Sequence, residues 1–457
     1  MLKKLKKEIS CQVLWEKEDV FPYAYDTSPN TKEVLLPKFV IFPESIEDVQ
    51  KIVRFANENN MVIVPRGAGT CHSGGCRVTE DTRQTIIIHF SKMNNILEID
   101  DKNLLAKVQP NVTIGELQRK VEKFGLFFPP DPSNLEVSTI GGAIALSSGG
   151  PKTFKYGAIK NYILSLDIVD YRGEVVKTGQ DIRKSVTGFN LTDLFIGSEG
   201  TLGIVVGATI KLIPKPECQK LILAYFKTLN EAGECVNKIV TSGITPSALD
   251  LLDDKTLLTI EKFNPCGLLT RYEAALLIEL DGNKQGVKRD SDRLSEILYE
   301  MNSAHIVNSE KPEINENIWR ARRSAFASCA KLAPNIVTED IVVPVGKITE
   351  IIKEIKLLSE KLGIMVCVMG HAADGNIHPN FALNFDNHQE RDNFYKLKDE
   401  LFMIAIKLGG TLSGEHGIGT EKKQYLSDAL DSNSLHYMKK IKKLFDPNNI
   451  FNPGKSI

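Results

Sequence analysis

The sequence lacks several features that would assign it to a common functional class. None of its eight cysteines forms a Cys-x-x-Cys pair, which argues against a zinc ribbon or a ferredoxin-type iron–sulfur cluster. Its 57 basic and 58 acidic residues leave a net charge of −1, so no basic face for nucleic acid is indicated. It has no run of about 18 uncharged apolar residues for a transmembrane helix. The basic start, Met1–Glu8, has no apolar segment for a secretory signal. Scattered thiols then favour a cytoplasmic location, with peripheral attachment to a membrane left open.

What is present fits a globular protein of several domains. The 457 residues are 42% hydrophobic and 25% charged, and roughly 100–200 residues make one domain. Helical and strand patterns alternate up to a Pro-Lys-Pro linker at residues 214–216. Beyond the linker, strands alternate with long helices, so a second domain of mixed α+β type is expected over residues 217–410.

Three glycine-rich loops are concentrated in the first part of the chain. The first, residues 65–75, follows a strand, and the next residues carry no apolar stripe before another strand. It is therefore neither a Rossmann loop nor a P-loop, both of which open a helix. The second loop, Ser138-Thr139-Ile140-Gly141-Gly142-Ala143, has a capping residue and then two glycines that enter an expected helix, and the third covers residues 196–204. Each could be a surface turn or a close packing point, but three together favour a phosphate site made of backbone amides.

Two histidines flank a predicted hairpin turn at Asp374-Gly375. If these two residues form the turn, His371 lies directly opposite His378, with Cβ atoms about 5 Å apart. Such a pair could be a hydrogen-bonded structural pair or two ligands of a metal. Glu415 is the candidate third ligand, and His416 would point the other way if the segment is extended. A histidine beside a divalent cation has a lowered pKa and suits a general base.

Five motifs together resemble the FAD-binding domain of vanillyl-alcohol-oxidase-type flavoproteins. They are Pro65-Arg66-Gly67-Ala68-Gly69-Thr70, Pro130-Asp131-Pro132, Ser138-Thr139-Ile140-Gly141-Gly142, Tyr156-Gly157 and Gly197-Ser198-Glu199-Gly200-Thr201-Leu202-Gly203. From about residue 36 to its C-terminus, the chain is similar to FAD-linked D-2-hydroxy-acid dehydrogenases, such as glycolate oxidase large subunits and D-lactate dehydrogenases. One departure is Ser147-Ser148-Gly149-Gly150, where the family often has Asn-Ala-Gly-Gly.

The resemblance implies an α+β fold in three parts. A two-part FAD-binding domain would cover residues 1–216, and a substrate-binding cap domain with an antiparallel sheet and the metal hairpin would cover residues 217–410. Residues 411–457 would return to the flavin. The implied cofactor-binding residues are Pro65, Arg66, Gly67, Ala68, Gly69, Thr70, His72, Ser73, Gly74, Pro130, Asp131, Ser138, Thr139, Gly141, Gly142, Tyr156, Gly157, Glu199, Gly200, Gly203, Ile204 and Asn452.

The resemblance also implies the remaining site residues. His371, His378 and Glu415 would hold one divalent metal (Zn, Mn or Fe), and His416 would be the catalytic base. Arg322, in a Trp-x-x-Arg motif that starts at Trp319, would grip the substrate carboxylate, and Asn380 matches a substrate-contacting position. The alternative for Arg322 is a solvated helix face.

The expected function is oxidation of a small D-2-hydroxy acid, D-lactate or glycolate, to the 2-oxo acid. With no iron–sulfur motif and no NAD-binding fold, the electron acceptor is expected to be an electron-transferring flavoprotein or an iron–sulfur subunit, with quinone left open. A D-2-hydroxyglutarate dehydrogenase would have a lysine where Thr338 stands, next to the acidic Glu339. Three further functions stay open at this point: a metallohydrolase, a non-redox FAD-dependent synthase and a non-catalytic electron-transfer subunit.

The role of His72 is considered separately, because the segment around it resembles that of another group of flavoproteins. In the dehydrogenase branch the corresponding residue is usually apolar, whereas Gly69-Thr70-Cys71-His72-Ser73 resembles the segment of alditol and sugar-lactone oxidases whose histidine bonds covalently to the flavin. Three roles stay open for His72: a covalent bond to FAD, a non-covalent contact with it, and a surface position.

Overall fold

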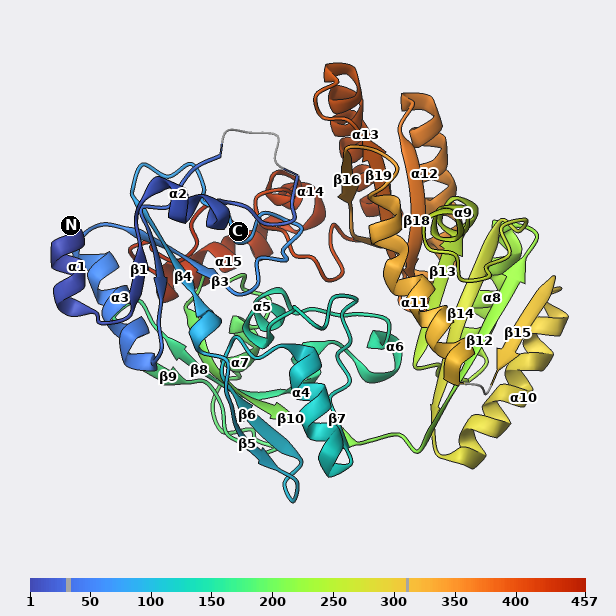
Figure 1. Ribbon diagram of the computed structural model, residues 1–457, viewed down its shortest axis with the longest axis horizontal. Coiled ribbons are helices and arrows are strands. Elements are labelled where there is room, and N and C mark those ends of the chain that lie inside the picture. The colour runs from blue at the N-terminus through green and yellow to red at the C-terminus, as the bar shows by residue number, and fades with distance from the viewer. Residues whose placement is uncertain (30–33, 310–311) are drawn as a thin grey trace. The chain divides into compact units, whose positions relative to one another are not determined.

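The computed structural model describes residues 1–29, 34–309 and 312–457, and the chain divides into two compact units (Figure 1). Unit 1 comprises residues 1–149, 158–215 and 415–457, and unit 2 comprises residues 150–157 and 216–414. The break between them falls between Lys215 and Pro216, at the expected linker. Two boundaries differ from the sequence-based division: residues 150–157 belong to unit 2, and unit 2 extends to Gly414. Among the described residues, no helix combines the length and apolar character needed to cross a membrane.

The first sheet of unit 1 carries the first glycine loop. Its strand order is β1 (Gln12–Leu14), β2 (Phe39–Phe42), β4 (Thr85–His89), β3 (Val62–Arg66), and β2, β4 and β3 run parallel. The loop therefore joins strand to strand without a helix, as predicted. Helix α3 (Ile46–Glu58) begins with a complete capping box between Ser45 and Asp48 and packs its apolar face into the core.

The second sheet of unit 1 is antiparallel. Its order is β5 (Ile96–Asp100), β6 (Leu105–Val108), β10 (Ile204–Lys211), β8 (Ile163–Val169), β9 (Val175–Lys177), and a small separate pair joins β7 (Leu126–Phe127) to β11 (Ile213–Pro214). Besides α3, the α-helices in the described part of this unit are α1 (Leu2–Glu8), α2 (Lys17–Val20), α4 (Ile114–Val121), α5 (Ile140–Leu146), α7 (Thr192–Phe195), α14 (Leu426–Ala429) and α15 (Ser432–Phe445). The C-terminal segment adds Phe451 to the core beside Ile63.

Unit 2 is built on one antiparallel sheet. The strand order is β15 (His305–Ser309), β12 (Cys218–Phe226), β14 (Ala274–Gly282), β13 (Ala248–Asp253), β18 (Met365–His371), β19 (Asn376–Leu383), β16 (Asn335–Thr338), and β17 (Ile341–Val342) also pairs with β19. Together with the first unit this confirms the mixed α+β class. Strands β13 and β19 are buried along their whole length because helices cover both faces of the sheet.

The two faces of this sheet are covered by different helices. Helices α9 (Asp254–Phe263) and α11 (Pro312–Cys329) pack on one face, where a core cluster includes Leu223 of β12, Leu277 of β14 and Met369 of β18. In Figure 1, α11 runs across the strands. Helices α8 (Leu229–Thr241), α10 (Lys284–Glu300) and α12 (Ile348–Leu362) contact the sheet as well, α12 packs against α13 (His388–Lys407), and α6 (Thr153–Tyr156) lies beside β13. Helix α11 and the sheet face beneath it carry the polar residues of interest.

The turn between β18 and β19 gives a stability prediction. Gly375 has φ +82°, and a Cβ there would overlap the carbonyl oxygen of Val343. Gly375→Ala should lower the free energy of unfolding by about 1–3 kcal/mol, through left-handed strain plus the clash. Gly346→Ala is the matched control, because nothing lies within 4 Å of its Cβ position. It should change stability by less than about 1 kcal/mol. Denaturant unfolding of both variants measures the difference, and equal losses would contradict the turn geometry.

Candidate active site

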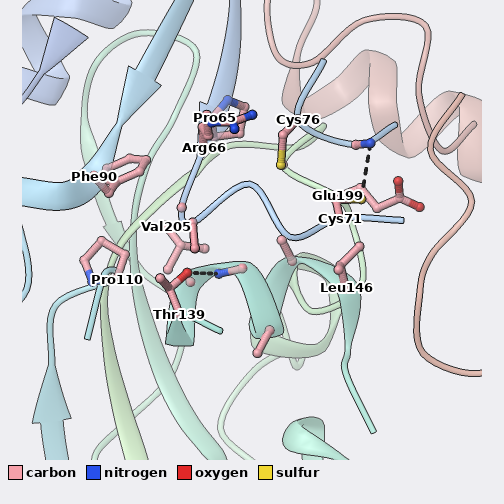
Figure 2. Close-up of a pocket in the computed structure, with 18 of the residues that line it drawn as sticks. Pro65, Arg66, Cys71, Cys76, Phe90, Pro110, Thr139, Leu146, Glu199 and Val205 are labelled. Atoms are coloured by element: carbon pink, nitrogen blue, oxygen red, sulfur yellow. Dashed lines mark hydrogen bonds between the residues drawn. The ribbon is translucent and has the colours of Figure 1, made fainter. Parts of the chain in front are cut away.

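A pocket in unit 1 gathers all three glycine-rich loops (Figure 2). Its empty volume is about 960 Å³, counting its opening to solvent. The expected residues that line it are Pro65, Arg66, Gly67, Ala68, Gly69, Thr70, Ser138, Thr139, Gly141, Gly142, Glu199, Gly200 and Gly203. Loops far apart in the sequence thus form one surface, which explains why they share a composition.

Close backbone approach explains the glycines. A Cβ at Gly141 would lie 2.8 Å from Pro110 Cβ, and one at Gly67 would overlap Thr139 Oγ1. Thr139 caps α5 by accepting the N–H of Gly142 at 3.2 Å, as Figure 2 shows. Ser147, at the other end of α5, has φ +55°, a left-handed conformation that asparagine adopts more readily than serine. This conformation explains why the family often has asparagine at the position of Ser147.

Arg66 gives the pocket a cation. Its side chain is buried, it lines the pocket, and its Nη1 has no hydrogen-bond partner among the described residues. An unsatisfied buried donor of this kind costs stability unless a ligand accepts from it. A glycine-lined pocket with one buried cation fits an anionic dinucleotide such as FAD, whose pyrophosphate needs close backbone and a positive charge.

Several expected cofactor residues do not line this pocket. They are His72, Ser73, Gly74, Pro130, Asp131, Tyr156, Gly157, Ile204 and Asn452. Tyr156 and Gly157 belong to unit 2, where the Tyr156 hydroxyl donates to the carboxylate of Asp281 at 2.9 Å. The sequence motif around Tyr156 did not reveal this, because residues 150–157 leave unit 1 and return to it within eight positions.

The C-terminal segment of unit 1 returns to the pocket through Glu199. The Glu199 carboxylate accepts the backbone N–H groups of Ile418 and Gly419, both at 2.8 Å. Asn452 donates to the backbone carbonyl of Glu199 at 2.7 Å, so it supports the pocket from behind. Burial raises the pKa of Glu199, although the two N–H donors act in the opposite direction.

His416 is fixed in the same segment. Ser73 Oγ donates to its carbonyl oxygen at 3.0 Å, and the His72 ring stacks on the His416 ring with centroids 4.7 Å apart. The residues around His416 form a bend rather than an extended strand. His72 therefore contacts the expected base directly; whether it also bonds to a flavin stays a prediction.

In unit 2, the carboxylate of Asp250 joins two of the expected site residues. Asp250 is completely buried on β13 and accepts from His371 Nδ1 at 2.8 Å and from Arg322 Nε. Burial alone would raise the pKa of Asp250, but Arg322 and His371 outweigh it and hold the pKa well below its usual range. Arg322 is 5% exposed, so it does not lie on a solvated helix face.

The hairpin register differs from the prediction. His371 lies opposite Asn376, and His378 lies opposite Met369, so the connection is four residues, 372–375, rather than two. The two histidines are diagonal rather than direct neighbours. The shift is two residues, and because side chains alternate with a period of two, both rings remain on one face. Their centroids are 5.2 Å apart.

A second carboxylate, Asp340, organises the other end of the hairpin. It is completely buried and accepts from Asn376 Nδ2 at 2.6 Å and from the backbone N–H of Gly414 at 2.9 Å. His378 Nδ1 lies 3.8 Å from an Asp340 oxygen. Glu415 is the first residue of the last segment of unit 1, and consecutive Cα atoms are about 3.8 Å apart. Glu415 is therefore the direct chain neighbour of Gly414, whose backbone N–H donates to Asp340.

Asn380 lies within the sheet, on β19, and bonds to the neighbouring strands. It is completely buried, accepts from Thr338 Oγ1 at 2.6 Å, and donates to the carbonyl oxygens of His378 at 2.9 Å and Cys367 at 3.3 Å. These contacts tie β19 to its neighbours. Substrate contact by Asn380 stays a prediction.

Asp250 and Asp340 were not found as site residues from the sequence. Asp250 stands in Ala-Leu-Asp-Leu-Leu-Asp, where Asp253 is equally buried but accepts from Thr256 and Val368 instead. Nothing in that run distinguishes the two. The signal that could have found Asp250 is a carboxylate on an otherwise apolar, fully buried strand, which needs a cationic partner.

The unpartnered donor of Arg66 gives a prediction about ligand affinity. Arg66→Met should weaken FAD binding by about 10–100-fold, the worth of one charged hydrogen bond. The free energy of unfolding of the flavin-free protein should not fall, since the variant removes a buried charge that lacks a full set of partners. Flavin titration and denaturant unfolding measure the two effects.

Arg83→Met is the matched control, because Arg83 pairs with Asp81 and donates to the Asn448 and Asn449 carbonyls. It should lower stability without a specific loss of flavin. Unchanged flavin affinity in Arg66→Met would refute the assigned role.

Comparison with known proteins agrees with this geometry. Two family models match: an FAD binding domain over residues 37–179 and the C-terminal domain of FAD linked oxidases over residues 215–456. Glycolate oxidase subunit GlcD of Bacillus subtilis (strain 168) is 41% identical over 433 residues, covering 95% of this chain and 91% of the relative. D-lactate dehydrogenase of Anaerostipes hadrus is 33% identical, covering 92% of this chain and 89% of the relative.

Solved structures show the same fold at low identity. Substrate-bound p-cresol methylhydroxylase superposes with a TM-score of 0.83 at 17% identity, covering 97% of this chain and 93% of that one. Alkyldihydroxyacetonephosphate synthase superposes with a TM-score of 0.77 at 20% identity, covering 99% and 84%. The two matching domains, the full-length relatives and the pocket lined by the three loops lead to one conclusion: the chain is a member of the FAD-linked oxidase family, with a vanillyl-alcohol-oxidase-type fold.

Proposed function

We propose that the protein oxidises a small D-2-hydroxy acid, such as D-lactate or glycolate, to the corresponding 2-oxo acid. The observation that carries the proposal is the buried Arg322–Asp250–His371 chain with His378 on the same sheet face. The names of the full-length relatives support the substrate class. FAD, when bound, accepts the hydride from the α-carbon of the acid.

The residues of the unit 1 pocket would hold the cofactor. The backbone of residues 67–70, Gly141 and Gly142 would approach the dinucleotide closely, and Arg66 would donate to an anionic or carbonyl oxygen. Glu199 would keep the third loop and the C-terminal segment in place around it.

Arg322 would bind and orient the substrate carboxylate. Its Nε donates to Asp250 and its Nη1 to Met369 Sδ, so residues in the described part of the chain accept from two of the five N–H donors of the guanidinium. The fixed plane then offers a charge-assisted, bidentate site for a carboxylate. His416, stacked on His72, would accept the hydroxyl proton.

His371, His378 and Glu415 would hold one divalent metal (Zn, Mn or Fe), which would lower the pKa of the substrate hydroxyl. The support is the pair of rings on one sheet face, together with the hydrogen bond between His371 and its neighbouring carboxylate. Asp250 accepts from His371 Nδ1 and would direct its other nitrogen toward a metal. Neutral imidazole and carboxylate ligands of this kind suit such cations.

The residues at positions 338 and 339 bear on the size of the substrate, and they favour a small acid. Thr338 donates to Asn380 and supplies no cation for a second carboxylate. Glu339, however, is paired with Lys398 at 3.3 Å, and both side chains are buried. Lys398 therefore balances the charge of Glu339, and what disfavours a second carboxylate is the absence of a lysine at position 338.

The electrons would pass to a partner protein, either an electron-transferring flavoprotein or an iron–sulfur subunit, since the chain has no Cys-x-x-Cys motif of its own. Eight cysteines without a structural disulfide fit a cytoplasmic enzyme. A metallohydrolase would not need the glycine-lined pocket, a non-redox synthase would not need the metal residues, and a pure electron-transfer subunit would not need Arg322 and His416.

The substrate prediction is tested by anaerobic addition of D-lactate, L-lactate, glycolate and D-2-hydroxyglutarate to the purified holoenzyme. D-lactate or glycolate should bleach the flavin absorbance, and L-lactate should not. Faster bleaching by D-2-hydroxyglutarate would assign the enzyme to a dicarboxylate instead. A protein that stays yellow with all four acids would contradict the proposed function.

The metal prediction is tested with His378→Ala. Removing one of three ligands should lower bound metal from about one per chain to near zero while the flavin stays bound, since the pocket is made by unit 1 residues. His388→Ala is the control, because His388 lies on α13 and contacts Arg391. Metal analysis showing full occupancy in His378→Ala would rule this ligand set out.

A further inference from the structure

The connection between β9 and α7 in unit 1 is a loop that is closed at its base. Thr178 follows β9 and Thr192 begins α7, and their buried hydroxyl oxygens lie 2.8 Å apart in a hydrogen bond. Thr178 Oγ1 also accepts the backbone N–H of Leu166, on β8, at 3.1 Å. Residues 179–191 therefore leave the sheet and return to it at one point, as compact surface loops do. The function proposed above gives this loop no role.

Two charged residues attach the first part of the loop to the sheet. Asp181 accepts from Ser165 Oγ on β8 at 2.7 Å and from Lys177 Nζ at 3.1 Å. Arg183 Nη2 donates to the carbonyl oxygen of Leu212 at 2.9 Å. The residues that follow Arg183 therefore project from an anchored base.

The outer part of the loop exposes large apolar side chains. Every residue from 182 to 190 is exposed, and Val186 and Phe189 are each 95% exposed. Gly188, with φ +81°, turns the chain between these two residues. A single exposed apolar side chain is common and needs no explanation. Two that are almost fully exposed on one turn contribute little to folding, so another reason for their presence is required.

The charge of the same segment is entirely positive. Arg183 and Lys184 are its charged residues, and no acidic residue occurs from Ile182 to Leu191. The helix that follows the loop, α7, contacts a second basic segment, since the rings of Phe195 and Phe445 lie 5.3 Å apart. Phe445 ends α15, whose sequence has four lysines and no acidic residue. The loop therefore combines apolar tips with a basic surrounding.

We propose that the 182–190 loop binds the surface of a membrane that contains anionic lipids. Val186 and Phe189 enter the headgroup region, and Lys184 lies close to the lipid phosphates. Burial of apolar side chains at the interface and attraction of cations to anionic lipids are the two contributions that hold a peripheral protein on a bilayer. The loop offers both.

The size of the loop favours a lipid surface over a protein partner. A specific protein interface takes about 800 Å² from each partner and needs matching shapes. One projecting turn with two apolar tips supplies neither a broad surface nor a groove. A fluid lipid surface needs no matching shape, so a short loop with cations beside it is sufficient.

The experiment mixes the purified holoenzyme with two kinds of vesicle and separates bound from free protein by flotation. One kind contains equal parts of phosphatidylglycerol and phosphatidylcholine, and the other contains phosphatidylcholine alone. The enzyme should float with the anionic vesicles and not with the neutral ones, and added sodium chloride should weaken the binding. Absence of binding to the anionic vesicles, or equal binding to both kinds, would overturn the proposal.

Variants of the loop test which residues carry the binding. Val186→Ser/Phe189→Ser should lower the partition coefficient onto anionic vesicles by at least about tenfold. Lys184→Gln should lower it by about fivefold, the worth of one cation near such a surface. Tyr299→Ser is the control, because Tyr299 of α10 is 85% exposed but is followed by an acidic residue, Glu300. It should bind as the unaltered enzyme does. Full binding by the double variant would refute the proposal.

Two further measurements on the double variant distinguish a lipid surface from other occupants of the loop. Because both side chains are 95% exposed, the variant should keep its flavin and its midpoint of unfolding. A clear loss of stability would mean that the tips pack against the protein's own chain. A dimer of the unaltered enzyme that the variant fails to form would assign the loop to a second copy. Either result would overturn the proposal.

Discussion

The candidate site of unit 2 depends on the charge of one carboxylate. Asp250 has no exposed surface, and an isolated charge at such a depth is too costly to persist. Arg322 and His371 supply the compensating donors. Because the compensation requires both partners, the same interaction fixes the rotamer of the arginine, the orientation of the imidazole, and the position of α11 against β13 and β18. Binding of a carboxylate and binding of a metal would therefore share one support.

In unit 1 the main constraint is different: the backbones of the pocket loops must approach neighbouring residues closely. Its pocket is lined by loops whose glycines stand where a Cβ would strike Thr139 or Pro110. The third loop is tied to the C-terminal segment through Glu199, which lines the pocket and accepts two N–H groups from that segment. A buried arginine completes the pocket. Under the proposed function the two units would have separate tasks. Unit 1 would bind the dinucleotide, and unit 2 would supply charged side chains for a small acid.

Much of this could be predicted from the sequence, because glycine loops and capping residues act locally. The strand–loop–strand character of residues 62–89 and a helix cap just before Gly141 and Gly142 follow from short segments. The register between paired strands cannot be predicted from short segments in this way. The diagonal position of His378 depended on a four-residue connection, which the Asp374-Gly375 pair did not reveal. Asp250 could not be distinguished from Asp253, since only the tertiary partners differ. Tyr156 was expected to bind the cofactor from a family motif, and its place in unit 2 was not foreseen because the excursion of residues 150–157 has no sequence signal.

The role of Asp250 is the most direct point at which to test this account. The measurement is metal content together with the acid concentration that gives half-maximal anaerobic flavin reduction, in Asp250→Asn and in the equally buried Asp253→Asn. We expect Asp250→Asn to lose metal affinity by about 10–100-fold and to need correspondingly more acid, while its flavin content is unchanged. Asp253→Asn should lose stability without either specific effect. Normal metal content and normal acid dependence in folded Asp250→Asn would contradict the account.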